Sequence, residues 1–148
     1  MSFTPITAEH LTYPKRLSND DSDYRWVIVK NASAFYKGGL AVFETGATGL
    51  VIPATNTASE PFAGVFAESG TGDGSAYYRV WVRGDHEFIK ATPAITDVGV
   101  EFYCDGGASG SDATVQSGTS TGCKVGRCVR YQGMGSGNVV ISIDDYCG

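Results

Sequence analysis

The chain has 148 residues, of which 42% are hydrophobic and 18% are charged. This length usually forms one domain, and the composition supplies a hydrophobic core, which excludes a wholly disordered chain. The formal net charge is −5, and no basic run occurs, so we expect no nucleic-acid partner. No apolar run approaches the roughly 20 residues that cross a bilayer, so we expect no membrane partner.

Residues 1–24 differ in pattern from the rest of the chain. Their prolines exclude a regular strand or helix, and their bulky apolar residues follow no sustained period. We interpret them as an extended N-terminal arm that docks on a partner, rather than as a floppy terminus. The beginning of the chain does not resemble a secretory signal, so we expect synthesis in a cytoplasm. The expected binding residues of the arm are Phe3, Thr4, Pro5, Ile6, Leu11, Tyr13 and Pro14.

Residues 25–148 are predicted to form a single β-domain. Twenty glycines, and short apolar or alternating runs between turn formers, favour an all-β fold over a helical bundle. We expect a compact β-barrel, β-tulip-like or sandwich domain of about eight short antiparallel strands. The segment 105–124 is rich in Gly, Ser and Thr and is predicted to be a surface loop. The expected strand runs are 25–30, 34–43, 49–53, 61–68, 77–83, 86–90, 98–104, 125–132 and 138–143.

The run 77–83 alternates clearly. Tyr78, Val80 and Val82 are predicted to share one face, and Tyr77, Arg79, Trp81 and Arg83 the other. Tyr77, Tyr78 and Trp81 would suit a platform on which sugar rings or bases stack. Aromatic residues on a sheet more often lie in a core or a subunit interface, so we treat these three as candidate interface aromatics.

Turn chemistry predicts a closing hairpin and, from it, a cysteine pair. A five-residue loop of turn formers, 133–137, separates the last two strand runs. If Gln132 lies opposite Asn138, antiparallel partners have residue numbers that sum to 270. Cys123 and Cys147 satisfy this sum, so we expect them to be neighbours within disulfide range.

The other two cysteines are expected to form the second pair. Cys104 and Cys128 lie on the flanking strands and could pair across the predicted loop. The sequence leaves open whether either pair is oxidised. A zinc site is disfavoured because the spacing of Cys123 and Cys128 is looser than a zinc knuckle and no second close pair exists.

No motif in the chain indicates catalysis. Gly84–Glu87 offers a histidine between two carboxylates, but adjacent strand residues alternate faces, so a solvated hairpin is favoured over an acid–base or metal site. Arg83–Asp85 matches an integrin-binding tripeptide and is interpreted as turn chemistry. The acidic stretches Asn19–Asp23 and Asp144–Asp145 do not follow the pattern of a calcium loop. We therefore predict no catalytic residue, metal or cofactor, and no enzyme activity.

Several short motifs follow one another along the chain in a recognisable order: Tyr36–Phe43, Pro61–Glu68, Val80–Lys90, Val98–Asp105, Val125–Val129 and Val139–Ile143. This order resembles a known family, the small capsid decoration (cement) proteins of tailed bacteriophages. The resemblance covers about residues 36–143. The chain departs from the family in its four cysteines, its long 105–124 loop and its N-terminal segment of 35 residues.

The resemblance implies a partner and a location. The protein would form homotrimers on the outer surface of a virion after synthesis in the host cytoplasm. There it would bind the major capsid protein and stabilise the shell. The N-terminal arm would add to capsid-protein elements, since backbone pairing needs no particular side chains. The alternative is a virion-surface β-domain that binds a host glycan or receptor through Tyr77, Tyr78, Trp81 and exposed loops.

Overall fold

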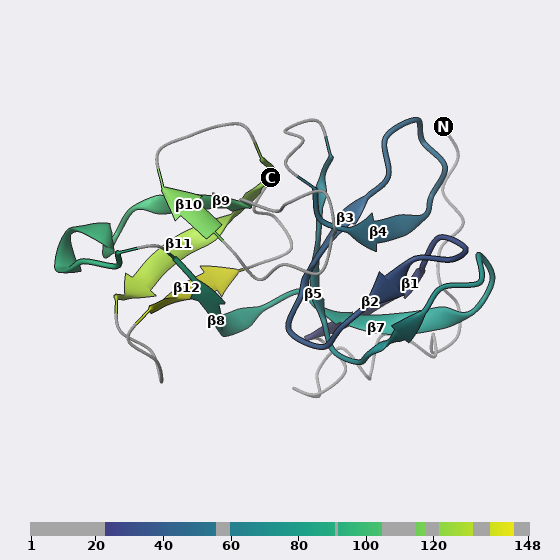
Figure 1. The fold of residues 1–148 in the computed structure, drawn as a ribbon, viewed down its shortest axis with the longest axis horizontal. Coiled ribbons are helices and arrows are strands. Elements are labelled where there is room, and N and C mark those ends of the chain that lie inside the picture. Colours follow the sequence, from purple (N-terminus) through teal and green to yellow (C-terminus); the bar gives the residue numbers. More distant parts are fainter. Residues whose placement is uncertain are drawn as a thin grey trace, which may run out of the picture.

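A computed structural model describes residues 23–55, 60–90, 92–104, 115–117, 122–131 and 137–143. Over these residues the chain forms antiparallel sheets and one short 3-10 helix (Figure 1), which confirms the all-β class. The elements are β1 (Tyr24–Ile28), β2 (Ala34–Phe35), β3 (Leu40–Phe43), β4 (Val51–Pro53), β5 (Phe62–Phe66), β6 (Gly70–Thr71), β7 (Tyr77–Trp81), β8 (Gly84–Ile89), η1 (Ile95–Asp97), β9 (Glu101–Cys104), β10 (Val115–Ser117), β11 (Lys124–Arg130) and β12 (Asn138–Ile143).

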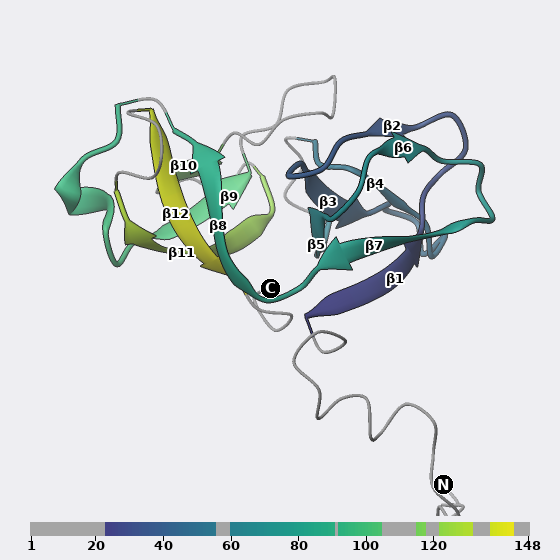
Figure 2. The same ribbon diagram turned by 90° about the horizontal axis from the view of Figure 1, so that it is seen from below.

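The first half of the chain folds into a five-stranded sheet with the order β1-β7-β5-β3-β4. Its β-branched and aromatic residues favour extended backbone, and turn formers keep the strands short. Beyond β1, Val29 makes a parallel bridge with Val51 of β4, and the Lys30 amide donates to the Val51 carbonyl at 3.0 Å. The two edges of the sheet therefore meet, which gives the curled lobe on the right of Figure 2.

The second half folds into another five-stranded sheet, with the order β10-β9-β11-β12-β8. β8 starts directly after β7, so the chain passes from one sheet to the other with two linking residues. β8 and β12 pair from Gly84 opposite Ile143 to Ile89 opposite Asn138. Gly84 has a φ of +101°, a backbone conformation that favours glycine, at the point where the chain enters the second sheet.

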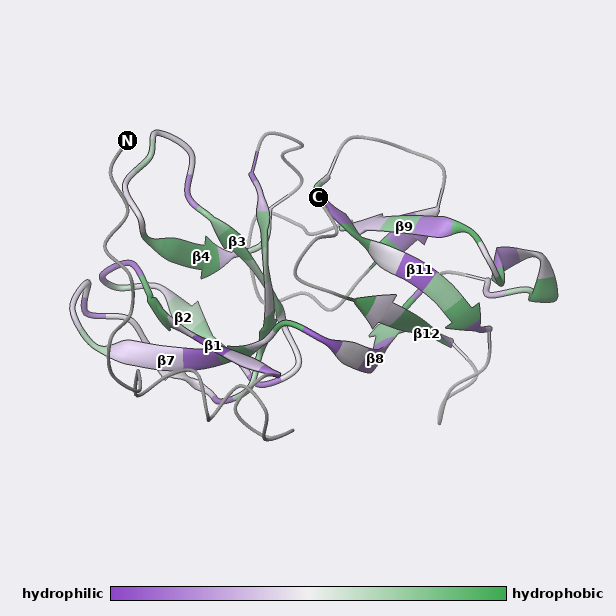
Figure 3. Ribbon diagram, turned by 180° about the vertical axis from the view of Figure 1, so that it is seen from behind, coloured by the Kyte–Doolittle hydropathy of each residue, from purple (hydrophilic) through white to green (hydrophobic). Residues whose placement is uncertain are grey.

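Two hydrophobic clusters hold the sheets together. One lies inside the first lobe, where Phe35 of β2 stacks on Phe66 at 4.7 Å and meets Tyr78 edge-on at 4.7 Å. The other joins the two sheets, because it contains Leu40 of β3 together with Phe102 of β9. Strand β3 is buried on both faces, and Figure 3 shows it in green, while β11 alternates between green and purple. This second cluster is therefore a core that the two sheets share.

The strand count differs from the prediction. The described residues form twelve strands rather than about eight. β6 and β10 have only two or three residues and carry no detectable hydrophobic period, and the predicted run 34–43 is divided into β2 and β3. The predicted surface loop 105–124 is partly wrong. It contains β10, which pairs with β9 and buries Val115, and Cys123 near its end is also buried.

Candidate functional site

The outward side of the β1–β7 pair carries a row of aromatic side chains and one arginine. The strands are antiparallel, with Tyr24 opposite Trp81 and Ile28 opposite Tyr77. Side chains alternate along each strand, so every second residue of both strands shares this side, while Val80 points into the core. We call this surface the aromatic face. It consists of Tyr24, Trp26, Ile28, Tyr77, Arg79 and Trp81.

Two rings of the aromatic face are largely in solvent. Trp26 is 61% exposed and Tyr77 is 62% exposed. Burying apolar surface against a partner is worth about 25 cal/mol per Å² before the costs of association are subtracted. Each ring also has a polar group at its edge that can hydrogen-bond at a partly wet interface. The face therefore offers large, rigid side chains to a partner.

Arg79 lies at the centre of the aromatic face. It is opposite Trp26 in the strand register, and its guanidinium carbon lies 5.1 Å from the Tyr24 ring centroid and 5.9 Å from that of Trp26. Each such cation–π contact is worth about 0.5–1 kcal/mol at an exposed site. The two rings therefore hold the Arg79 guanidinium close to the aromatic face.

Glu68 fixes the base of the Arg79 side chain. Its Oε2 accepts hydrogen bonds from the Arg79 amide at 2.9 Å and from Nε at 3.4 Å. In the described part of the chain the guanidinium bonds to Glu68 through Nε, so its two terminal nitrogens can still donate to a partner. A planar guanidinium held in this way is suited to a carboxylate, which accepts two parallel hydrogen bonds.

Trp81 belongs to the aromatic face and to the core at the same time. Its ring stacks on Tyr24 with centroids 4.1 Å apart, and it packs against the cluster that joins the sheets. A hollow of about 200 Å³ beside it is lined by residues that include Lys37, Phe66 and His86. Trp81 is therefore only partly exposed, at the junction of the two lobes.

The structure divides the three aromatics singled out in the sequence. It places Tyr77 and Trp81 on the aromatic face, on opposite sides of Arg79 along β7. Tyr78 points to the other side, where it packs on Phe35 and its hydroxyl donates to the Thr71 carbonyl at 3.3 Å. The strand alternation predicted for residues 77–83 is confirmed, and it separates Tyr78 from the other two.

Sequence reasoning missed the contribution of β1 to the face. The sequence pattern assigns Tyr24 to the arm and predicts only a strand for the run 25–30, which contains Trp26. Alternation of side chains with a period of two along this run would place Trp26 on the face of the strand opposite to that of the buried Val27. This period does not predict that β1 pairs with β7, because the two strands are about fifty residues apart in the chain.

Comparisons with protein-family models, curated proteins and solved structures found no match to this chain. The candidate site therefore rests on the geometry of the chain itself. Within the described residues, no helix is long and apolar enough to span a membrane.

The last residue of the predicted arm, Tyr24, begins β1, whereas residues 1–22 lie outside the described residues. The latter include Phe3, Thr4, Pro5, Ile6, Leu11, Tyr13 and Pro14. The described chain begins at Asp23, whose carbonyl accepts a hydrogen bond from the Val82 amide at 2.8 Å. This bond places the start of the described chain beside the aromatic face, next to the Tyr24–Trp81 pair.

The strand registers correct the predicted cysteine neighbours. Lys124 lies opposite Tyr103, so Cys123 follows opposite Cys104, and the Cys104 amide donates to the Cys123 carbonyl at 2.8 Å. Cys128 lies near the other end of the β9–β11 pair, where its amide donates a hydrogen bond to the Val100 carbonyl. The predicted pairing of Cys104 with Cys128 is therefore wrong, because the antiparallel register separates them along the strands.

The second predicted cysteine pair falls partly outside the described residues, since Cys147 is among those not described. The register from which it was inferred holds only at one end of the hairpin. Arg130 opposite Val140 gives a sum of 130 + 140 = 270, but beyond a register shift Cys128 opposite Ile141 gives 128 + 141 = 269. Among the described residues, Cys104, Cys123 and Cys128 are not joined in a disulfide in this structure.

The residues Gly84–Glu87 are spread over two sides of β8. His86 lies on the same side as the buried Phe88, and its Nε2 is 3.0 Å from the Arg83 carbonyl oxygen. Glu87 lies on the other side and accepts a hydrogen bond from Asn138 at 2.8 Å. Among the described residues, no three His, Cys, Asp or Glu side chains form a group that could hold a metal ion.

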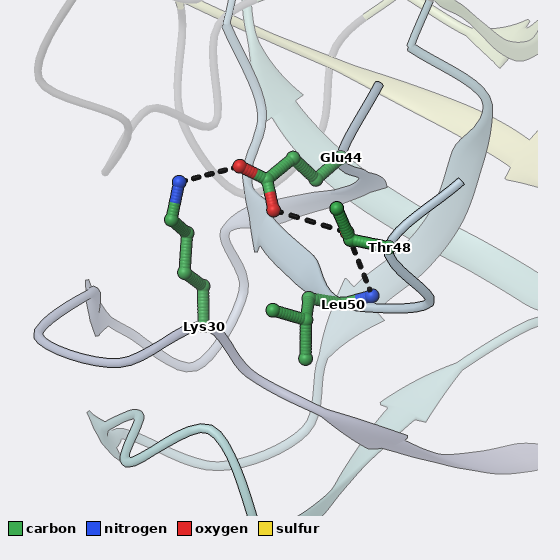
Figure 4. A network of polar contacts seen from close by, with 4 residues as sticks. All are labelled: Lys30, Glu44, Thr48 and Leu50. Carbon is green, nitrogen blue, oxygen red and sulfur yellow. Dashed lines mark hydrogen bonds and ion pairs between the residues drawn. The ribbon is translucent and has the colours of Figure 1, made fainter. Parts of the chain in front are cut away.

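A polar network fixes the turn between β3 and β4 (Figure 4). Glu44 forms an ion pair with Lys30, and its other oxygen accepts a hydrogen bond from the Thr48 hydroxyl at 3.0 Å. Thr48 in turn accepts a hydrogen bond from the Leu50 amide at 3.3 Å. The hydrogen bond from Lys30, followed by that from Thr48, lowers the pKa of Glu44. The network thus ties the end of β1 to this turn.

Proposed function

We propose that the protein is a virion structural protein that decorates and stabilises a phage capsid by binding the lattice of the major capsid protein. The observation that carries the proposal is the aromatic face, with Trp26 and Tyr77 largely exposed and Arg79 held between rings. Trp, Tyr and Arg are the residues that dominate the energetics of protein–protein interfaces. The resemblance of residues 36–143 to capsid decoration proteins supports the choice of partner.

The contacts of the face define the chemistry expected of the partner surface. Trp26 and Tyr77 would bury their rings against apolar side chains of the capsid protein. Arg79, already fixed by Glu68, would donate its terminal nitrogens to a carboxylate at the centre of that contact. Truncating a central aromatic of this kind typically costs at least about 2 kcal/mol of binding free energy, or roughly a thirty-fold loss of affinity.

The N-terminal arm remains part of the proposal. Residues 1–22 are followed by Asp23 and then by β1, so an arm bound to the capsid would join the β-domain beside the aromatic face. Backbone pairing by such an arm would add affinity without requiring particular side chains. The proposed assembly on the outer surface is a homotrimer, formed after synthesis in the host cytoplasm, and we assign it no enzymatic role. Light scattering of the purified protein tests the trimer.

The test of the proposal is binding to capsids that lack the protein. Purified wild-type protein and the variants Trp26→Ala, Tyr77→Ala and the double variant are mixed with such shells and sedimented. We expect each single variant to bind at least about ten-fold more weakly than wild type. Ile95→Ala is the matched control, because Ile95 is 69% exposed but lies on η1, away from the aromatic face. Full affinity of the double variant would exclude this face as the capsid contact.

Deleting residues 2–20 tests the arm separately. If the shortened protein remains folded but no longer sediments with shells, the arm carries part of the attachment. If it coats shells with full affinity, the arm has no role and only the aromatic face remains as the contact. Circular dichroism of the shortened protein decides whether a loss of binding is a loss of fold.

A second candidate function is recognition of a host glycan on the same surface. It is favoured by the same exposed rings, Trp26 and Tyr77, beside the polar groups of Arg79 and Glu68. Aromatic rings can stack against sugar rings while fixed polar groups orient the hydroxyls. Glycan-array binding that is lost in Trp26→Ala, together with no sedimentation of wild-type protein with shells, would support this function over capsid decoration.

A further inference from the structure

Cys104 and Cys123 face each other across two paired strands. Cys104 ends β9 and Cys123 immediately precedes β11, and their backbones share a hydrogen bond of 2.8 Å. The neighbouring pair, Lys124 opposite Tyr103, makes the two cysteines directly opposed. Directly opposed residues in antiparallel strands have Cα atoms about 4.5–5.5 Å apart, within the range that a disulfide spans.

The two thiols also meet in the core. Cys104 and Cys123 are both buried in the cluster that joins the two sheets. A hydrogen bond between their side chains, followed by burial, raises the pKa of Cys123. Gly122 allows this approach, because a Cβ at that position would collide with the carbonyl oxygen of Cys104. The chain is thus built to bring these two sulfurs together.

We propose that Cys104 and Cys123 form a structural disulfide when the protein meets a small-molecule disulfide such as oxidised glutathione. One cysteine, as its thiolate, attacks a sulfur of the oxidant and releases one reduced thiol, which leaves a mixed disulfide. The second cysteine loses its proton and attacks the protein sulfur of that mixed disulfide, which releases the second reduced thiol. The protein dithiol is oxidised by two electrons, and the oxidant is reduced by two.

This bond would be a covalent cross-link within the second sheet. It ties the end of β9 to the start of β11 and closes the chain between them into a loop, which restricts the unfolded chain. Buried thiols with raised pKa values react slowly, so the bond forms during folding or local opening and then resists reduction. A protein that leaves a reducing cytoplasm would acquire it. This inference does not depend on the proposed function.

Peptide mapping tests the pairing directly. The wild-type protein is refolded from denaturant in a buffer of reduced and oxidised glutathione, digested without reduction and analysed by mass spectrometry. We expect a cross-linked peptide pair that contains Cys104 and Cys123. A cross-link from Cys123 to Cys147, a cross-link from Cys104 to Cys128, or recovery of all cysteines as thiols would each overturn the proposal.

Thermal unfolding provides a second measurement, with a matched variant. We expect oxidation to raise the midpoint of thermal unfolding by about 10 °C in wild-type protein and in Cys128→Ser. This is the rise expected when a disulfide closes a loop of this length. Cys104→Ser should show no such rise. Cys128 is the appropriate control because it is equally buried, but its thiol donates to the Arg130 carbonyl at 3.4 Å, away from the pair. If Cys104→Ser does not fold, the peptide map of wild-type protein still decides.

Discussion

The rings of Tyr24 and Trp81 stack with centroids 4.1 Å apart and planes inclined by 29°. Trp81 also packs against the core cluster that joins the two sheets. The stack therefore connects the exposed surface to the interior. Within the aromatic face, Trp81 is therefore anchored in the core. The exposed rings of Trp26 and Tyr77 are held mainly by their strands.

Replacing the two tryptophans should have different effects on stability. Trp81→Ala removes core packing and the stack on Tyr24, so we expect it to reduce the free energy of unfolding by about 2–3 kcal/mol. Trp26→Ala removes a mostly exposed ring and should cost less than about 1 kcal/mol. Denaturant titration measures both. Equal losses in the two variants would contradict the anchoring of Trp81 in the core.

Gly64 should not tolerate a side chain. Its φ is +146°, and a Cβ there would collide with the Trp81 carbonyl oxygen and lie 3.1 Å from a methyl group of Val80. We expect Gly64→Ala to destabilise the protein by about 3 kcal/mol or more, from strain and overpacking together. The control is Gly46→Ala, where φ is +93° but the space is open, so only about 1 kcal/mol is expected. Similar midpoints in urea for the two variants would refute the close approach at Gly64.

The carboxylate of Asp97 should contribute to stability through η1. Its Oδ2 accepts a hydrogen bond from the Ala94 amide at 2.8 Å and lies 3.1 Å from Lys90 Nζ, in a largely buried position. Asp97→Asn removes the negative charge of the ion pair, and we expect it to lower the free energy of unfolding by about 2 kcal/mol. The exposed Asp85 provides a control, Asp85→Asn, that should leave the thermal midpoint nearly unchanged. An unchanged midpoint for Asp97→Asn would show that the ion pair is dispensable.

Stability should fall in mild acid. Glu44 and Glu101 each have a pKa below the ordinary 4.5, mainly through hydrogen bonds from Lys30 and Lys124 respectively. A carboxyl whose pKa is lowered by folding stabilises the fold above its unfolded pKa, and this is lost as pH falls through the folded value. We therefore expect the thermal midpoint to decrease from about pH 5 downward. Glu101→Gln should flatten this decrease, and a midpoint that is the same at low and neutral pH would argue against the prediction.

The shared core predicts that both sheets unfold together. Phe102 is fully buried in the second sheet, and Phe102→Ala should cost about 3–5 kcal/mol. Both tryptophans, Trp26 and Trp81, lie on strands of the first sheet, so their fluorescence reports mainly on that sheet. We expect Phe102→Ala to shift the fluorescence transition and the circular dichroism transition equally. Two separate transitions would instead indicate that the halves fold independently.

The sequence by itself determined the all-β class and the placement of many strands. Local patterns were sufficient where neighbours in the chain decide the outcome. The alternation of residues 77–83 correctly placed Val80 and Arg79 on opposite faces of the strand, because side chains on a strand alternate whatever the strand pairs with. That the face of Val80 is the buried one came from the structure. Strands of two or three residues within predicted loops, β6 and β10, were missed because so short a segment shows no period.

The tertiary structure alone decided which residues from distant segments meet. Trp26 and Arg79 become neighbours through the pairing of β1 with β7, and a one-residue slip in that register would move Trp26 to the other face. The same holds for Cys104 and Cys123, whose partner choice changed once the β9–β11 register replaced the hairpin arithmetic. Side-chain alternation is a local property of the backbone, whereas strand pairing depends on how the whole chain buries its apolar surface.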